Sequence, residues 1–560
     1  MDIDRRDFFK ILGVAGAAVG PQPKEATRKL MPLVIPADDV TPGVANWYAT
    51  VCGECPAGCG VLAKVREGRA IKVEGNPNHP INQGALCPRG QASLQGLYNP
   101  DRLTQPLRRN ASGQFQPVSW EEVEQFVAER LAAIRFRGKA RRIAFLTQQS
   151  TGSLDRLIDD WLGALGSTLR LVYETFAYEP LREANRICFD QDDISVYRIE
   201  EAEFLLSFGA DFLETWLSPV EFARGFARMR RLRDGNTGRF IYIGPRLSLT
   251  AANADEWIVP KAGTELFLAL GMLHVIVQEN IGATLLSAEA EWLWKLVEPY
   301  DPEKVAILTD IAAEKVKSLA RAFAQAHSAL ALGNGVATNA SNATATAVAM
   351  NLLNYVTGNV GRTVRFHERR NGQTLASLHD LLGFIAAMKR GEVEVSTRSS
   401  DLIDGLMQPV MQPVFQTKAV GDVLLSVARQ VDAAVAARFP WKSFYDYLRD
   451  AWREVHRSVT PTTDFESFWQ EALMQGGVFR PSPGGTVRLR LDAPIRLEEA
   501  RFEGEPGNPL LLPYPSPYFF DGRGANKPWL QELPDPTTKA VWGSWVEVHP
   551  STASKLGIGN

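Results

Sequence analysis

The stretch that decides the fold is 52–60, which reads CGECPAGCG, together with 87–90, which reads CPRG. These two runs hold four of the five cysteines, spaced C-x2-C-x3-C-x27-C. Three thiolates on one tight loop can occupy three corners of an iron–sulfur cubane, and a distant fourth thiolate closes it. The predicted ligands of a [4Fe–4S] cluster are therefore Cys52, Cys55, Cys59 and Cys87.

Two other uses of these cysteines stay open on spacing alone. Structural zinc is also bound by four thiolates, but zinc sites usually contain two C-x2-C pairs, and here the second half supplies a single cysteine. Two disulfides would suit an exported protein, but disulfides do not require the x2/x3 spacing. The spacing therefore favours an iron–sulfur cluster over both.

The overall composition excludes several classes of protein. The 560 residues include 61 Lys+Arg and 64 Asp+Glu, so the chain has no general basic footprint for nucleic acid. With 45 % hydrophobic and 22 % charged residues it is an ordinary globular chain, long enough for several domains. The seven histidines show no H-x3-H or HExxH spacing, and no nucleophile-elbow or Walker motif supports a hydrolase or an NTPase.

The first residues read MDIDRRDFFKILGVAGAAVG, with paired arginines Arg5 and Arg6 before a mild apolar run. This pattern resembles a twin-arginine export signal, which carries folded, cofactor-loaded proteins across a membrane. An amphipathic first helix with a basic start is the alternative. The interpretation assigns 1–43 to a signal and linker, and it predicts an exported, periplasmic protein or one held at the outer face of the cytoplasmic membrane by partner subunits.

Short β-like runs at 60–65 and 70–73 flank the cysteine loop, so 44–108 is predicted to form a separate iron–sulfur domain. From 484 the sequence turns β-rich and proline-punctuated. The segment 484–560 is therefore predicted to begin a β-rich C-terminal domain. The family that the chain resembles, named below on its motifs, has a β-barrel at this place. The resemblance implies the start of such a barrel and a continuation past Asn560, because a barrel needs its remaining strands to remove open edges.

Between these parts, the segment 109–483 alternates helical spacing with buried strands. A helix is expected over 120–136, and a strand at 142–146 is followed by a helix at 154–165. The runs 203–209 and 240–244 are further strands that end in glycine. Such β–loop–α repeats predict an α/β fold with interleaved, doubly wound parallel sheets, whose ligand sites lie at the carboxyl ends of the strands.

Further motifs outside the cysteine runs are VEGNP at 73–77, SFGAD at 207–211, GPR at 244–246, ADEWI at 254–258, GTE at 263–265, GNVG at 358–361 and VEVHP at 546–550. With the cysteine runs, they resemble the molybdopterin oxidoreductases of the dimethyl-sulfoxide-reductase type. Within that superfamily, 47–52, 411–415 and 521–532 are most similar to the molybdopterin-oxidoreductase-like iron–sulfur subunit of alternative complex III.

This resemblance implies a subunit of a membrane-bound, quinol-oxidising complex of the respiratory chain. The implied partners are a multi-cluster ferredoxin-like subunit or domain, an integral-membrane quinol-binding subunit and c-type cytochromes. The implied cofactor is one [4Fe–4S] cluster, and members of that branch are thought to carry no molybdopterin guanine dinucleotide.

The chain departs from the catalytic members of the superfamily at the molybdenum ligand. Those members supply a Ser, Cys, selenocysteine or Asp to the metal, and Cys188 lies about where that ligand falls. Its apolar neighbours favour a core position instead, because free cysteines are among the most buried residues. The nearby Asp190, Asp192 and Asp193 are expected to be solvated turn residues.

A second departure lies between Glu394 and Gln408. Relatives pass there through a further strand, a Gly-x-Asn-Pro turn and an αβ segment that helps to hold a guanine dinucleotide. This chain goes from GEVEV at 391–395 through STRSS at 396–400 to MQP at 407–409, and the segment is missing.

Three residues match cofactor-binding positions of the family. Arg89 matches the Lys/Arg between cluster and pterin, where a fixed cation favours the reduced cluster and raises its potential. The alternative for Arg89 is a surface arginine in a solvated ion pair. Asp211 and Asp255 match nucleotide-binding positions and, in a chain without the nucleotide, are expected to cap helices or turns.

The leading hypothesis is an electron-transfer subunit of a quinol oxidoreductase, with its own catalytic site in doubt. The alternatives are a bis-pterin molybdenum enzyme acting on a small oxyanion, sulfur compound or formate, and a scaffold kept for docking. The stretch 513–536 is a candidate partner interface, because it places aromatic and basic residues among prolines. The residues concerned are Tyr514, Tyr518, Phe519, Phe520, Arg523, Lys527 and Trp529.

Overall fold

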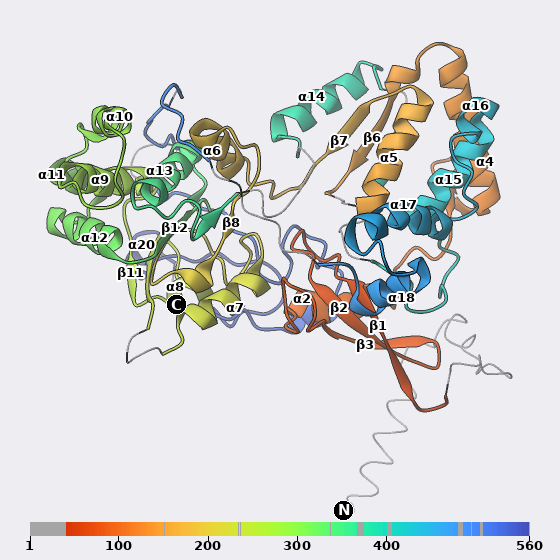
Figure 1. Cartoon of the computed structure of the whole chain (residues 1–560), viewed down its shortest axis with the longest axis horizontal. Helices are drawn as coiled ribbons and strands as arrows, with labels where there is room; N and C mark the ends of the chain where they lie inside the picture. Colours follow the sequence, from red (N-terminus) through yellow and green to blue (C-terminus); the bar gives the residue numbers. More distant parts are fainter. Residues whose placement is uncertain are drawn as a thin grey trace, which may run out of the picture.

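The computed structural model describes residues 41–558 apart from gaps at 150–151, 233–234, 236, 336–337, 367–374, 394, 400–405, 480–484, 486, 494 and 505–507. Arg5, Arg6 and the rest of the predicted export signal lie outside the described residues. Two lobes stand side by side, and a small domain, red to orange in Figure 1, lies at their base.

The small domain is a three-stranded antiparallel sheet formed by β1 (Ala45–Val51), β2 (Gly60–Arg66) and β3 (Arg69–Gly75). Two short helices follow it, α2 (Pro88–Gln91) and α3 (Ser93–Leu97). The predicted β-runs at 60–65 and 70–73 are confirmed as β2 and β3, whereas β1, on the other side of the cysteine loop, was not predicted. A separate hairpin of β4 (Leu107–Arg109) and β5 (Phe115–Pro117) leads to the first lobe.

The first lobe has a parallel sheet in the order β14-β6-β7, formed by β14 (Val395–Ser399), β6 (Ile143–Thr147) and β7 (Leu169–Val172). Its helix α4 (Trp120–Phe136) begins where Ser119 and Glu122 form a reciprocal capping box, which satisfies two free backbone N–H groups. The other helices of this lobe are α5 (Gly152–Leu165), α14 (Leu378–Lys389), α15 (Val420–Val431), α16 (Ala433–Ala436), α17 (Phe444–Val459) and α18 (Phe465–Gln475).

The second lobe has a parallel sheet in the order β11-β10-β9-β12. Every residue of β9 (Phe204–Phe208) and β12 (Ala329–Gly333) is buried, so helices must cover both faces of the sheet. The other strands are β10 (Arg239–Ile243), β11 (Glu256–Ile258) and an antiparallel pair, β8 (Val196–Tyr197) with β13 (Val364–Arg365). Its helices are α6 (Glu179–Phe189), α7 (Pro219–Met229), α8 (Leu249–Ala252), α9 (Glu265–Gln278), α10 (Ser287–Val297), α11 (Pro302–Thr309), α12 (Ala313–Gln325) and α13 (Ala343–Val356).

The two lobes are interleaved in sequence, as predicted. The chain leaves the first lobe after β7, builds the second lobe, and returns through α14 to β14. Strand β14 corrects the expectation that no further strand lies between 391 and 408. The alternation of β-branched residues at Val395 and Thr397 suits an extended strand beside β6.

The predicted C-terminal barrel is not confirmed. From 485 onward, the one β-type pairing among the described residues is an isolated bridge between Gly485 and Phe366. Prolines recur through this segment, and each lacks the N–H group that a strand ladder needs. The segment runs across the other domains, and in its described part it forms only the short helices α19 (Pro528–Glu532) and α20 (Pro550–Lys555).

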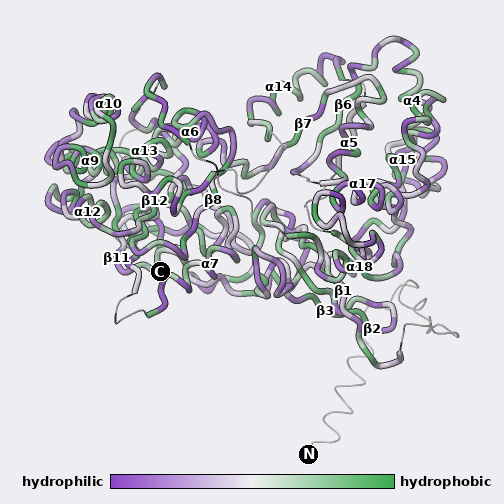
Figure 2. Tube along the Cα trace, viewed as in Figure 1, coloured by the Kyte–Doolittle hydropathy of each residue, from purple (hydrophilic) through white to green (hydrophobic). Residues whose placement is uncertain are grey.

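Apolar residues are distributed as in a globular protein. Figure 2 shows hydrophobic and hydrophilic residues alternating along the helices of both lobes. In the described part of the chain, no helix combines the length and apolar character of a membrane span.

Cys188 is fully buried on α6, within the core of the second lobe. Burial raises the pKa of its thiol to about 12, and the core position predicted for it is confirmed. Asp190, which directly follows α6, has 78 % of its side chain exposed, and Asp192 pairs with Arg182 at 2.8 Å. Both therefore lie at a solvated turn, as expected.

We predict that Cys188→Ala lowers the free energy of unfolding by about 1 kcal/mol, because only a small buried side chain is removed. Urea unfolding measures this loss, and the iron content should stay unchanged. Loss of iron from a folded Cys188→Ala protein would show that Cys188 is a metal ligand.

Candidate functional site

Three of the four predicted ligands lie in the loop that joins β1 to β2, and the fourth immediately precedes α2. The backbone N–H of Cys52 donates to the carbonyl oxygen of Cys59 at 2.8 Å, which closes the loop on itself. Cys55 and Cys59 are buried, whereas Cys52 and Cys87 are half-buried. The structure thus brings the four predicted thiols together at the base of the two lobes.

The thiols lie near enough to influence one another. Burial, followed by the charges of Cys55 and Cys87, raises the pKa of Cys52. Burial, followed by the other three cysteines, raises the pKa of Cys59. These thiols can lose their protons together only when bound metal supplies positive charge, so metal binding here must release protons.

This donor set fits a [4Fe–4S] cluster, which needs four converging thiolates. Four thiolates are also the donor set of a structural zinc site, and among the described residues no group of three or more His, Cys, Asp or Glu side chains is arranged to hold a metal ion. All five cysteines are free thiols, so the disulfide alternative is not realised in this structure.

Asn82 links the cysteine loop to the chain that leads to the fourth ligand. Its buried side chain accepts a hydrogen bond from the Gly60 N–H at 3.0 Å and donates to the carbonyls of Gly60 and Ala85 at 2.8 and 2.7 Å. Gly60 must lack a side chain, because a Cβ atom there would lie 2.5 Å from the His79 ring. Sequence reasoning missed Asn82 and His79, since neither lies in a motif with a recognisable spacing.

Arg89 is not a surface residue, so the solvated ion pair considered for it is wrong. Only 2 % of Arg89 is exposed, and its guanidinium lies 4.5 Å from the centre of the Phe520 ring. Burial opposes its charge, but Cys55 and Cys87 outweigh burial and raise the pKa of Arg89. Its Nε and Nη1 atoms are buried without a hydrogen-bond partner, so its positive charge remains available to the thiol site.

Two further basic residues reach the cysteine loop from the far end of the chain. Arg523 Nη1 lies 3.4 Å from the carbonyl oxygen of Gly53, and Lys527 forms an ion pair with Glu54. The sequence analysis placed Arg523 and Lys527 at a partner interface. The structure turns both toward the candidate cluster, and no local signal could have revealed a contact between residues 470 positions apart.

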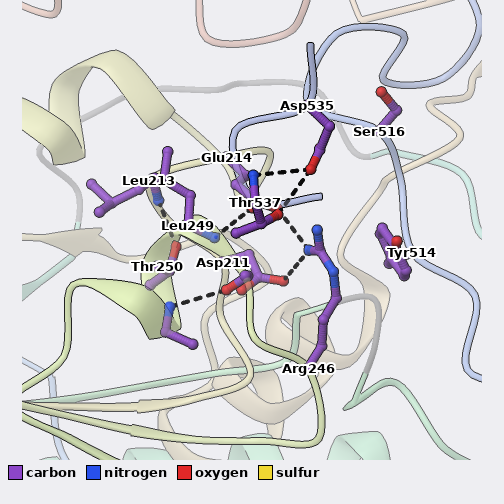
Figure 3. A network of polar contacts seen from close by, with 12 residues as sticks. Asp211, Leu213, Glu214, Arg246, Leu249, Thr250, Tyr514, Ser516, Asp535 and Thr537 are labelled. Atoms are coloured by element: carbon purple, nitrogen blue, oxygen red, sulfur yellow. Dashed lines mark hydrogen bonds and ion pairs between the residues drawn. The ribbon is translucent and has the colours of Figure 1, made fainter. Parts of the chain in front are cut away.

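A second polar cluster lies where β9 and β10 end, at the edge where a parallel sheet binds ligands (Figure 3). Arg246 Nη1 lies 2.7 Å from Glu214 Oε2 and 3.6 Å from Asp211 Oδ2. The Tyr242 hydroxyl donates to Asp211 at 2.9 Å, and the ring of Tyr514 lies 3.7 Å from the Arg246 guanidinium. Asp211 is therefore a member of a buried ion network, which differs from the cap expected for it.

A guanine dinucleotide at this edge would meet closely packed turns and paired charges. A diphosphate needs free backbone N–H groups and excess positive charge. The turns after β9 and β12 instead touch each other, since a Cβ atom on Gly335 would lie 1.6 Å from the Gly209 carbonyl oxygen and one on Gly209 would lie 2.2 Å from Thr338. The single arginine faces two buried carboxylates and is covered by Tyr514.

Asp255 has a structural role, as expected. Its carboxylate accepts two hydrogen bonds from Arg230, at 2.6 and 2.7 Å, and one from the Phe240 N–H at 2.8 Å. Burial opposes its charge, but these donors outweigh burial and lower the pKa of Asp255. The carboxylate thereby fixes the turn that leads from α8 into β11.

Comparisons with known proteins agree with this architecture. Residues 45–99 match the molybdopterin oxidoreductase Fe4S4 domain, and residues 102–439 match the molybdopterin oxidoreductase family. Acetylene hydratase from Pelobacter acetylenicus has a similar fold, with a TM-score of 0.58 and 16 % identity over 76 % of this chain and 73 % of that one.

The chain is 30 % identical to the menaquinone reductase molybdopterin-binding-like subunit of Nitratidesulfovibrio vulgaris (strain Hildenborough), over 63 % of this chain and 51 % of that protein. It is 28 % identical to the periplasmic nitrate reductase of Desulfovibrio desulfuricans, over 59 % of this chain and 45 % of that protein. The chain therefore spans about half the length of these relatives.

We predict that Cys55→Ser abolishes iron binding and destabilises the small domain, because a domain with little core of its own depends on the energy of metal binding. Iron content and visible charge-transfer absorption measure the first effect, with Cys188→Ala as the control. Full iron content in Cys55→Ser would contradict the ligand assignment.

A second prediction concerns pH. Burial, followed by Glu214, raises the pKa of Asp211 from 3.8 to about 6, so the folded protein binds more protons than the unfolded chain between these values. Asp211 should therefore stabilise the fold less as the pH rises through about 6.

Asp211→Asn should remove this part of the pH dependence, as measured by urea unfolding from about pH 4 to about pH 7. Asp255→Asn is the matched control with the opposite sign. The lowered pKa of Asp255 contributes stability that is lost as the pH falls. An unchanged slope in Asp211→Asn would contradict the assignment.

Proposed function

The chain belongs to the molybdopterin oxidoreductase family, and from this premise we propose that it is the electron-transfer iron–sulfur subunit of a quinol-linked respiratory oxidoreductase. The observation that carries the proposal is the contrast between its two sites. Four thiols converge beside the buried cation of Arg89, whereas the chain's own residues fill the sheet edge near Arg246.

In this proposal Cys52, Cys55, Cys59 and Cys87 hold one [4Fe–4S] cluster. Such a cluster exchanges one electron at a time and performs no bond chemistry, so the subunit relays or stores electrons. The closed turns at Gly209 support a subunit that works without molybdopterin guanine dinucleotide. The similarity to a menaquinone reductase subunit described as molybdopterin-binding-like supports the link to quinone.

Partner subunits are part of the proposal, because a single cluster needs a donor and an acceptor. We assign these roles to a multi-cluster ferredoxin-like subunit or domain, a membrane quinol-binding subunit and c-type cytochromes. A location at the outer face of the cytoplasmic membrane agrees with the pattern at Arg5 and Arg6.

A groove beside the small domain supports docking of the redox partner. It has a volume of about 930 Å³ and lies between the small domain and the stretch 525–542. Tyr98, Trp529 and Trp542 line it together with two arginines, and both tryptophans are more than half exposed. Exposed tryptophan, tyrosine and arginine side chains are typical of the centres of protein interfaces.

The position of the groove limits the partner interface predicted over 513–536 to a part of that stretch. Tyr514 contacts Arg246 and Phe520 contacts Arg89, so both rings are used within the chain. The part of the stretch around Trp529 remains available for a partner.

Metal analysis of the purified complex tests the proposal. We expect about four iron atoms per copy of this chain beyond those that the ferredoxin-like and cytochrome partners bind, and no molybdenum. Near-stoichiometric molybdenum would favour the alternative of a bis-pterin reductase. The similarity to a nitrate reductase is the observation that supports this alternative. Zinc in place of iron would favour a scaffold kept for docking.

A further inference from the structure

The turn 520–527 places charged side chains of opposite sign beside the cysteine loop. Arg523 Nη2 lies 2.6 Å from Asp521 Oδ2 and 3.3 Å from Glu174 Oε2, while its Nη1 faces Gly53 in the cysteine loop. The side chains of Arg523, Asp521 and Glu174 are only 16, 5 and 2 % exposed. Solvent and salt therefore screen these charges weakly.

The turn holds these charges at fixed positions. Gly522 has φ +101°, which other residues rarely adopt, and a Cβ atom on Gly524 would lie 2.6 Å from the Tyr518 carbonyl oxygen. The side chain of Asn99, from the small domain, donates to the carbonyl of Asn526 at 2.8 Å. The turn is thus anchored to the domain that carries the thiols.

The Arg523 cation lies directly against the predicted ligands. Its Nη1 atom is 3.4 Å from the carbonyl oxygen of Gly53, which lies between Cys52 and Cys55 in the sequence. A positive charge that favours the thiolate also favours any added negative charge at the same place. Arg523 differs from Arg89 in that two buried carboxylates adjoin it, so its loss would leave Asp521 and Glu174 without this cation at the edge of the cysteine loop.

We infer that Arg523 and Asp521 are positioning residues for the iron–sulfur cluster. Arg523 raises the midpoint potential of the cluster, and Asp521 lowers it. The inference rests on the proposed function, in which the four cysteines hold that cluster. Reduction by one electron adds one negative charge within the ring of thiolates. The Arg523 cation stabilises the reduced state, and the Asp521 carboxylate destabilises it.

A redox titration of the complex, followed by electron paramagnetic resonance with dithionite as the electron donor, tests this inference. Arg523→Gln should shift the midpoint to more negative values, and Asp521→Asn should shift it to more positive values. The double variant should return toward the wild-type midpoint, because the two charge changes cancel. Arg523→Lys keeps the charge and should stay closer to wild type than Arg523→Gln.

The exposed pair of Arg390 and Glu392 provides matched controls, since its two hydrogen bonds, both 2.8 Å long, join the same types of charge just after the end of α14, in the first lobe. Arg390→Gln and Glu392→Gln should leave the midpoint unchanged. Shifts of the same sign in Arg523→Gln and Asp521→Asn, or no shift in either at full iron content, would overturn the inference.

Failure to fold and failure of the proposed function give different results. If Arg523→Gln alone lacks iron, the sign of the shift in Asp521→Asn and the midpoint of Arg523→Lys still decide the question. If the wild-type protein itself contains no iron, the proposed function is wrong and the inference falls with it. A purely structural role would lower thermal stability without opposite shifts of the midpoint.

Discussion

The constraint on which the rest of the structure depends is the grouping of four thiols, two buried and two half-buried, in one small domain that has little core of its own. Burial raises the pKa values of Cys52 and Cys59, so the site tolerates thiolates only when positive charge surrounds them. The chain meets this demand with Arg89 from inside the domain and with Arg523 from its C-terminal segment. Both cations are held in place. The Phe520 ring packs against Arg89, and the carboxylate partners of Arg523 form ion pairs with it.

The C-terminal segment joins the two polar sites of the molecule. Tyr514 covers Arg246 at the sheet edge of the second lobe, and a few residues later Phe520 and Arg523 reach the cysteine loop. One stretch of chain therefore packs an aromatic ring against the sheet edge where a parallel sheet could bind a ligand. The same stretch also brings a positive charge to the thiols. Both contacts are possible because the described part of this proline-rich segment forms no sheet of its own. Its side chains can therefore contact other domains.

Much of the fold could be predicted from local patterns in the sequence. The helix α4 begins and ends at the predicted residues, because apolar spacing and the cap at Ser119 act within a few positions of each other. The buried strands β9 and β10 also follow from runs of apolar residues that end in glycine. The predicted barrel is not confirmed for a related reason, since alternation at 486–491 indicates an extended chain but cannot supply the neighbouring strand that a ladder needs.

By itself, the sequence determined the parallel α/β architecture and the core position of Cys188, and it grouped four thiols as predicted cluster ligands, since these depend on the spacing or polarity of nearby residues. Only the tertiary structure decided that Arg89 is buried, that Asp211 joins an ion network, and that Arg523 lies at the cysteine loop. Each of these depends on a contact between distant segments, up to 470 positions apart. The strength of a charge in such a contact is set by burial and distance, which appear only when the chain is folded.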